Sequence, residues 1–364
     1  MSKRRLERFR LASLRIAGYC SSRTLLRALL CFSVSSNVEA QAPDALRAEE
    51  VTYWSEDGSV ALNASLVLPD GAGPHRGVVV LSVAGTTPLV NRLVDDGYAV
   101  LLPTRRGFVE VEPLLRATYA DLAGDVRAAL GYLGSRQEVD PEALAVIAQA
   151  DDTPPAMMAA VSSAGAPPLV LMAPPIFQGV ETFRLEQRGQ AERAGAPEDE
   201  LEALDEFVRR MGEIVLAEET PYMRRYRLES LRAGSPVQLP HNAAFPSDER
   251  QMHFFASPLW RDRLAFDPEM VLAEVHAPTL VLIGTEDVNI PLDVYLLAID
   301  RSLSASGNTD VGLCLLPGRT RHAFTEAGVA AIGEWLARHM AAPSRPTDSR
   351  GWGPPSACLV DEGR

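Results

Sequence analysis

The chain has 364 residues, of which 46% are hydrophobic and 23% are charged, a balance typical of a globular protein with a full core. Its formal net charge of −13 disfavours nucleic acid and anionic membranes as partners, because phosphate groups require a basic face. Lys3 is the only lysine, so the chain beyond it has no amine for a Schiff base and no lysine for a phosphate-binding P-loop.

Residues 1–40 differ in kind from the rest of the chain. Basic residues come first, an apolar run over 25–32 follows, and Val38 and Ala40 occupy positions −3 and −1 of a cleavage site. This order predicts a secretory signal peptide over 1–40, and hence a periplasmic or secreted protein without a membrane span. Arg27 interrupts the apolar run, so a basic leader or a misplaced start codon stays open as the alternative. Cleavage after Ala40 would leave 27 basic and 46 acidic residues, a net charge of −19.

The following segments predict strands and helices in regular alternation. Residues 51–54 and 61–69 alternate apolar and polar residues on either side of Asp57-Gly58, which predicts a hairpin of half-buried strands. Continuous apolar runs further on predict strands buried on both faces. Strands that alternate with helices indicate βαβ crossovers, so we expect an α/β fold with a doubly wound, mostly parallel sheet of about eight strands. These strands are 78–81, 98–103, 144–147, 169–174, 279–284 and 311–316, and the helices are 89–96, 118–133, 156–163, 291–303 and 326–339.

The alternation stops at Pro175 and resumes at Thr279. The segment between them is charged and rich in helix formers, with no strand pattern of its own. We therefore expect a helical cap over 176–266, inserted above the carboxyl ends of the strands, where open α/β sheets bind ligands. A merely decorative insertion is the alternative. The core then comprises 41–175 and 267–340, and the proline- and glycine-rich residues 341–364 form a flexible tail.

Cysteine and histidine usage gives little sign of metal or redox chemistry. Cys314 lies in an apolar run and is interpreted as a buried structural thiol, although a disulfide with Cys358 is open in an oxidising compartment. No cysteine or histidine spacing is that of a metal site. We expect no metal and no cofactor.

Three loops that follow predicted strands hold the candidate site. Residues 145–154 predict a buried strand that enters a tight turn and then a helix of small residues. Asp287 and His322 each come directly after a later strand. Either residue alone would be ordinary, since aspartates often cap helices and histidines are common at loop tips. An acid that orients a histidine, however, is the pair that activates a nucleophile or a water molecule.

From about Val51 to His339 the chain resembles bacterial α/β-hydrolases of the esterase, dienelactone-hydrolase and acyl-peptidase-like groups. In that family the nucleophilic serine lies in a Gly-x-Ser-x-Gly turn between a strand and a helix, and the acid and histidine follow in that order. The resemblance implies action on carboxylic esters or acyl-peptide bonds, with Asp287 as the acid and His322 as the base. The matching stretches are 103–107, 139–141, 185–187, 257–261, 266–268, 287–291, 307–311 and 316–318.

The chain departs from the family at the reacting centre. The turn reads Ala148-Gln149-Ala150-Asp151-Asp152, with Ala150 at the serine position, and Val83-Ala84 stands where the family has the His-Gly of the oxyanion loop. Alanine has no oxygen to attack an acyl carbon, and loss of the serine lowers kcat on the order of a million-fold in subtilisin. Because the glycines of the turn are also replaced, we expect an altered turn and no ordinary serine-hydrolase activity.

Three interpretations remain open. In the first, the protein is not catalytic and binds a small acyl or ester-like molecule, or a protein, under the cap, with His322 and Asp287 kept as structural residues. In the second, His322 oriented by Asp287 acts as a general base in a non-covalent hydrolysis, elimination or isomerisation. In the third, a one-residue shift makes Asp151 the nucleophile, as an aspartate is in dehalogenase-like relatives. The third would also shift the inward face of the preceding strand.

Overall fold

The structure is a computed structural model that describes residues 48–81, 86–107, 111–161, 165–234, 249–286, 292–305, 307–318 and 325–340. The predicted leader over 1–40 and the predicted tail over 341–364 lie outside these residues. Within the described part of the chain, no helix is both long enough and apolar enough to cross a bilayer.

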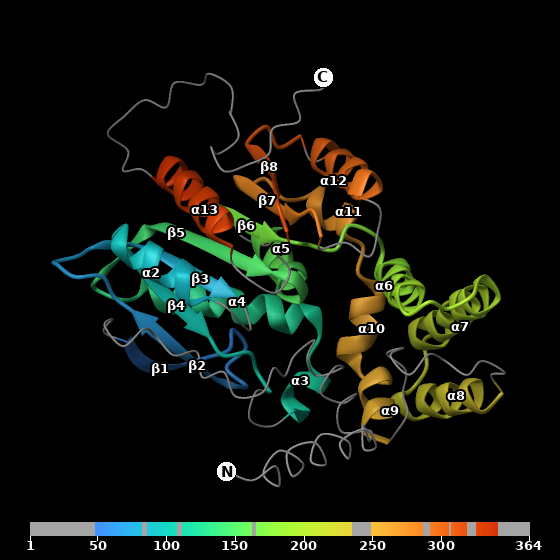
Figure 1. The fold of residues 1–364 in the computed structure, drawn as a ribbon. Helices are drawn as coiled ribbons and strands as arrows, with labels where there is room; N and C mark the ends of the chain where they lie inside the picture. Colours follow the sequence, from blue (N-terminus) through green and yellow to red (C-terminus); the bar gives the residue numbers. More distant parts are fainter. Residues whose placement is uncertain are drawn as a thin grey trace, which may run out of the picture.

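An eight-stranded sheet in the order β1-β2-β4-β3-β5-β6-β7-β8 runs through the core (Figure 1). Strand β2 pairs antiparallel with both β1 and β4, and all the other neighbouring pairs are parallel. This confirms the predicted doubly wound, mostly parallel sheet. The strands are β1 (Ala48–Trp54), β2 (Ala61–Val67), β3 (His75–Leu81), β4 (Tyr98–Pro103), β5 (Val139–Gln149), β6 (Leu169–Met172), β7 (Thr279–Gly284) and β8 (Val311–Leu316).

Helices cover both faces of the sheet. On one face a cluster centred on Trp335, which is 1% exposed, joins α2 and α13 to the strands. On the other face α4, α5, α11 and α12 pack against β5, β6 and β7. The helix α4 begins at the predicted capping box, in which Thr118 and Asp121 bind each other's backbone N–H groups. The core helices are α2 (Thr87–Asp95), α3 (Glu112–Arg116), α4 (Tyr119–Gly134), α5 (Thr153–Val161), α11 (Pro268–Leu272), α12 (Leu292–Ala305) and α13 (Glu326–His339).

The strand β5 begins earlier than the sequence predicts. We expected it to start at Leu144, after Asp140-Pro141, but it starts at Val139 and runs through the proline. Its pairing with β3 shifts register between His75 and Gly77, so Pro141 lies in an irregular stretch where the ladder needs no N–H donor. A proline can therefore be part of this strand without breaking the sheet.

Between β6 and β7 most of the described chain is helical, and α6 to α10 form an insertion with its own apolar core, which we call the cap. Trp260 is 3% exposed and lies edge-on to Phe183, with the two ring centroids 5.0 Å apart. Figure 1 shows the cap beside the sheet, with α10 between the core and the outer cap helices. The cap helices are α6 (Gly179–Arg193), α7 (Glu198–Leu216), α8 (Pro221–Ala233), α9 (Glu249–Phe255) and α10 (Pro258–Ala265).

Cys314 lies in β8 and is fully buried, as expected, but it is disulfide-bonded rather than a free thiol. The apolar pattern of its strand predicted the burial and carried no information on its oxidation state. Cys358, the partner considered from the sequence, lies outside the described residues.

Candidate functional site

The turn after β5 lies at the carboxyl edge of the sheet, near its centre. Ala148 is in register with Leu81 on β3, and Gln149 is in register with Met172 on β6. The chain then turns at Ala150, whose φ of +50° is in the left-handed region that non-glycine residues rarely adopt. A sharp, strained turn between a strand and a helix is where an α/β-hydrolase places its nucleophile. We call residues 148–152 the elbow.

The elbow accommodates its substituted residues in a tight turn with a left-handed apex at Ala150. Ala148 is fully buried in the sheet, where its methyl group finds room. Thr153 is also fully buried, and both its N–H and its hydroxyl donate to the carbonyl oxygen of Ala150, the hydroxyl at 2.6 Å. Asp152 points to an arginine beside the turn. The glycine-free sequence is thus compatible with the left-handed apex at Ala150.

The two acids after the apex are held by arginines from different parts of the fold. Asp152 accepts a hydrogen bond from Arg105, which follows β4. Asp151 accepts one from Arg263 of α10, with 2.8 Å between Oδ1 and Nη1. Arg263 also lies 3.6 Å from the carboxylate of Glu186 on α6. We call these five residues the ion-pair chain, and it connects the core, the elbow and the cap.

Burial and charge act together on the ion-pair chain. The exposed fractions of the four side chains beside the elbow are 20% for Arg105, 17% for Asp152, 17% for Arg263 and 21% for Asp151. Burial acts to lower the pKa of both guanidinium groups, but the neighbouring carboxylates outweigh it, so both pKa values are raised. Both arginines therefore stay charged. Burial also raises the pKa of Tyr119, whose hydroxyl stays neutral.

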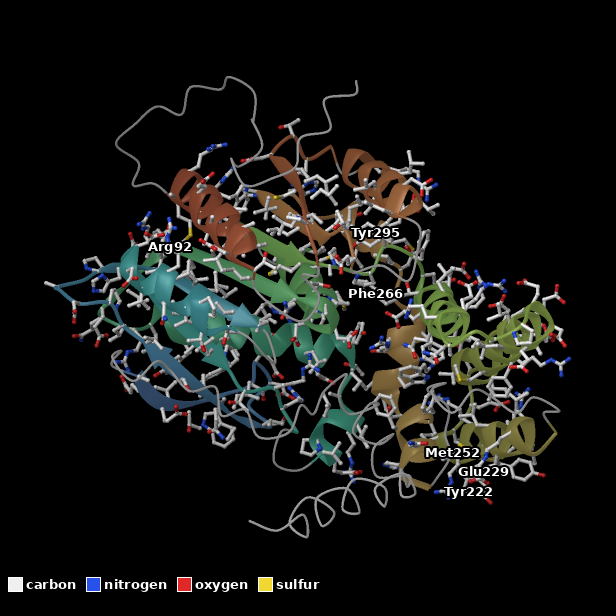
Figure 2. All side chains as sticks on the ribbon, viewed as in Figure 1. Arg92, Tyr222, Glu229, Met252, Phe266 and Tyr295 are labelled. Carbon is white, nitrogen blue, oxygen red and sulfur yellow. The ribbon has the colours of Figure 1, made fainter. Side chains whose placement is uncertain are left out.

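A second contact ties α10 to the core next to Arg263. The backbone N–H of Tyr119, at the start of α4, donates to Asp262 Oδ2 at 2.9 Å. The ring of Tyr119 lies edge-on to Phe266, with centroids 5.6 Å apart. Figure 2 shows Phe266 where the end of α10 meets the core, whereas Tyr222 lies at the far end of the cap. The junction of cap and core therefore lies beside the elbow.

The sequence did not assign roles to Arg105, Arg263 and Glu186. Arg105 and Glu186 lie within stretches that match the family, at 103–107 and 185–187, which was a signal that these positions matter. Arg263 lies two residues beyond the matching stretch 257–261. Its pairing with Asp151, 112 positions away, has no local sequence signature.

Four of the candidate site residues lie outside the described residues: Asp287, His322, Val83 and Ala84. The described stems of the loops that carry Asp287 and His322 are joined by three hydrogen bonds. Leu316 and Gly318 accept from the backbone N–H groups of Thr285 and Glu286 at 2.9 Å, and Gly318 N–H donates to the Thr285 hydroxyl at 3.1 Å. Both loops therefore leave the sheet from adjacent strands, β7 and β8.

Across the described ranges, no group of three or more histidine, cysteine, aspartate or glutamate side chains is arranged to hold a metal ion. The carboxylates at the elbow are instead held by arginines. The described site therefore consists of an alanine apex, two aspartates and the cationic side chains that bind them.

No protein-family model matches the sequence, and comparison with curated protein sequences finds no significant match. Solved structures are similar in fold. The 2,6-dihydroxy-pseudo-oxynicotine hydrolase is 16% identical with a TM-score of 0.51, over 81% of this chain and 68% of that one. An esterase of Pyrococcus furiosus is 16% identical with a TM-score of 0.51, over 84% and 96%. The α/β-hydrolase GrgF of Penicillium sp. sh18 is 16% identical with a TM-score of 0.50, over 82% and 100%.

At these identities the likeness establishes the fold. The chain has the α/β-hydrolase fold, with its elbow after β5 and helices inserted between β6 and β7. Fold alone does not determine activity, because function depends on the groups at the site.

Proposed function

We propose that this protein binds a small acyl or ester-like molecule under its cap and does not act as a serine hydrolase. The observation that carries the proposal is Ala150 at the left-handed apex of the elbow. At that position a methyl group stands where the chemistry requires a nucleophilic oxygen. The proposal places the ligand beside Ala150, because ligands of open α/β sheets bind at the carboxyl ends of the strands.

The two acids of the elbow support a non-catalytic role. A carboxylate that accepts hydrogen bonds from a guanidinium group is stabilised as an anion and is a poorer nucleophile than a free one. Asp151 is in that state, bound to Arg263 at 2.8 Å. It also lies one residue beyond the left-handed apex rather than at it. Nucleophilic attack by Asp151 would therefore require its ion pair to break and the turn to rearrange.

A second candidate function is general-base catalysis by His322 with Asp287. The observation that favours it is the pair of hydrogen-bonded loop stems after β7 and β8, which start the two loops side by side. A histidine oriented by an acid can activate water without a covalent intermediate. This function predicts slow turnover that does not depend on the residue at position 150.

An esterase assay with p-nitrophenyl acetate and butyrate separates the two functions. We expect the purified protein to give no turnover above that of His322→Ala, and a panel of short carboxylic acids and their methyl esters to contain a compound that raises the Tm in a dose-dependent way. Turnover that is lost in His322→Ala but kept in Asp151→Asn would replace binding by general-base catalysis. Turnover lost in Asp151→Asn but kept in Arg263→Met, which breaks the same ion pair, would identify Asp151 as the nucleophile.

Ala150→Ser tests how much of the catalytic site is left. We expect the variant to stay inactive on the same esters, because Val83-Ala84 replaces the oxyanion-loop motif of the family. The unmodified protein, which has a methyl group and no nucleophile at the left-handed apex, is the matched control. Ester turnover by Ala150→Ser alone would mean that only the nucleophile is missing, and that the protein is one substitution away from an enzyme.

We also propose that the protein is exported, on the basis of the basic and apolar residues of the leader over 1–40. N-terminal sequencing of the protein expressed in a Gram-negative host checks this proposal. A mature chain that begins after Ala40 in the periplasmic or medium fraction supports it, and an uncleaved chain in the cytoplasm contradicts it.

A further inference from the structure

Two adjacent residues of α10 bind two different parts of the core. Asp262 accepts from the Tyr119 backbone N–H at 2.9 Å, and Arg263 donates to Asp151 at 2.8 Å. Neighbouring residues on a helix point about 100° apart, so the two contacts hold α10 from two directions. Rotation of α10 about its axis would break both.

Helix α6 of the cap is attached directly to α10. Glu186 of α6 is 3% exposed, and its carboxylate lies 3.6 Å from Arg263. At the start of α6, Gly179 donates its N–H to the Phe266 carbonyl at 2.8 Å. A Cβ atom at Gly179 would lie only 1.8 Å from the carbonyl oxygen of Arg263, so the two backbones are in direct contact. We therefore expect α6 to move together with α10.

The ion pair at the elbow differs from those on the cap surface in its burial. Arg263 and Asp151 are 17% and 21% exposed, whereas Arg209 and Glu206 on the outside of α7 are 54% and 44% exposed. Exposed pairs contribute little because solvent screens them. Removal of one partner from a largely buried pair leaves an uncompensated charge and is strongly destabilising. The Arg263–Asp151 pair joins the cap to the elbow and is largely buried, whereas the Arg209–Glu206 pair lies within α7 and is largely exposed.

From these contacts we propose that the elbow anchors the cap: Asp151 holds α10 through Arg263, so the cap closes over Ala150 and opens when this pair breaks. The proposal rests on the function proposed above, since it concerns access to the same site. In this proposal Asp151 has a structural role rather than a catalytic one. The turn that carries the nucleophile in hydrolases becomes the point at which the cap is fastened.

Amide hydrogen exchange of the ligand-free, full-length protein tests the anchor. We expect Arg263→Met, which keeps the length of the side chain and removes its charge, to exchange at least tenfold faster in α10 and α6. Exchange in α2 and α13, on the far face of the sheet, should be unchanged. Arg209→Met, the same substitution in an exposed cap pair, should leave α10 unchanged as the matched control.

Two further variants make the test specific to the pair. Asp151→Asn should accelerate exchange in α10 as Arg263→Met does, and because both changes remove the same pair, the double variant should exchange within threefold of the faster single variant. Unchanged exchange in α2 and α13 would show that Arg263→Met is folded. If Arg263→Met does not fold, Asp151→Asn is expected to show the same faster exchange in α10. Equal α10 exchange in Asp151→Asn and the unmodified protein would overturn the proposal. Since no ligand or ester is used, this result is independent of whether the protein binds or hydrolyses one.

Discussion

Arg263 Nη1 on α10 lies 2.8 Å from Asp151 Oδ1, one residue beyond the apex of the elbow. A cation from the cap therefore lies close to Ala150, the position to which the family resemblance assigns the nucleophilic serine. On the other side of the same turn, Arg105 binds Asp152. The elbow supplies the two acids of these pairs, and the loop after β4 and α10 supply the two arginines.

The strained backbone at Ala150 predicts that glycine is better tolerated there than alanine. A left-handed conformation costs a non-glycine residue roughly 1–2 kcal/mol, and the entropy of glycine in the unfolded chain offsets about 0.4–1 kcal/mol of that gain. Ala150→Gly should therefore raise the free energy of unfolding by up to about 1.6 kcal/mol, measured by urea titration. Ala173 has a φ of +48°, so Ala173→Gly should likewise raise the free energy of unfolding.

The control for that prediction is Ala148→Gly, in the buried strand before the apex. It should lower the free energy of unfolding by roughly 0.5–1 kcal/mol, because glycine in a strand interior gains nothing from positive φ. A loss of stability in Ala150→Gly comparable to that in Ala148→Gly would contradict the left-handed apex.

Replacement of Arg105 should destabilise the protein more than replacement of both members of its pair. Arg105→Met leaves Asp152, at 17% exposed, without its cation, and loss of one partner of a buried pair costs about 3–5 kcal/mol. The double variant Arg105→Met with Asp152→Leu removes both charges and should recover most of the loss. Urea unfolding of the two variants measures the difference. A double variant less stable than Arg105→Met would show that Asp152 is stabilised by groups other than Arg105.

The contact between α6 and α10 predicts that Gly179 cannot be replaced even by alanine. The added Cβ would lie 1.8 Å from the Arg263 carbonyl oxygen and 2.7 Å from Leu264 Cα, both backbone atoms that cannot turn aside. Overpacking of this kind costs typically 1–3 kcal/mol and sometimes more. Gly179→Ala should lower the free energy of unfolding by at least that amount.

Gly131 in α4 provides the matched control, since a Cβ there meets nothing within 4 Å. Gly131→Ala should stabilise the protein by up to about 1 kcal/mol through helix propensity. If the two glycine variants have the same stability, the close approach of α6 and α10 is not present in solution.

Asp57 in the β1–β2 turn gives a pH dependence whose sign follows from its hydrogen bonds. Side-chain hydrogen bonds from Ser55 and Ser59 lower the pKa of Asp57 from 3.8 to about 2. Because the folded-state pKa is depressed, the stabilisation is present above pH 3.8 and is lost as the pH falls towards 2. The stability difference between the unmodified protein and Asp57→Asn should therefore shrink between pH 5 and about 2. Urea midpoints across that range measure it, and a constant difference would contradict the assignment.

Local patterns in the sequence predicted the sheet and its helices. The hairpin around Asp57-Gly58, the capping box at Thr118 and the buried runs of the parallel strands all act over a few residues, so a single sequence records them. The elbow was located for the same reason, as a strand that enters a turn and a helix of small residues. The predicted start of β5 was wrong because an irregular stretch opposite β3 accommodates Pro141.

The interactions around the elbow could not be read from the sequence in the same way. Arg105 and Asp152 are 47 positions apart, and Asp151 and Arg263 are 112 positions apart. Ion pairs leave no periodic signal, and any of the many arginines of the chain could have met either acid. The partners became visible only when the fold brought the loop after β4, the elbow and α10 to one edge of the sheet.

The ion-pair chain also bears on how the molecule melts. The cap has an apolar core of its own around Trp260 and Phe255, separate from the two faces of the sheet, and such a unit can unfold by itself. The free-energy penalty for desolvating charged groups falls as temperature rises, so the ion pairs that join the cap to the sheet keep their stabilising effect on heating. Calorimetry should consequently record one cooperative transition for cap and core together rather than an early cap melt.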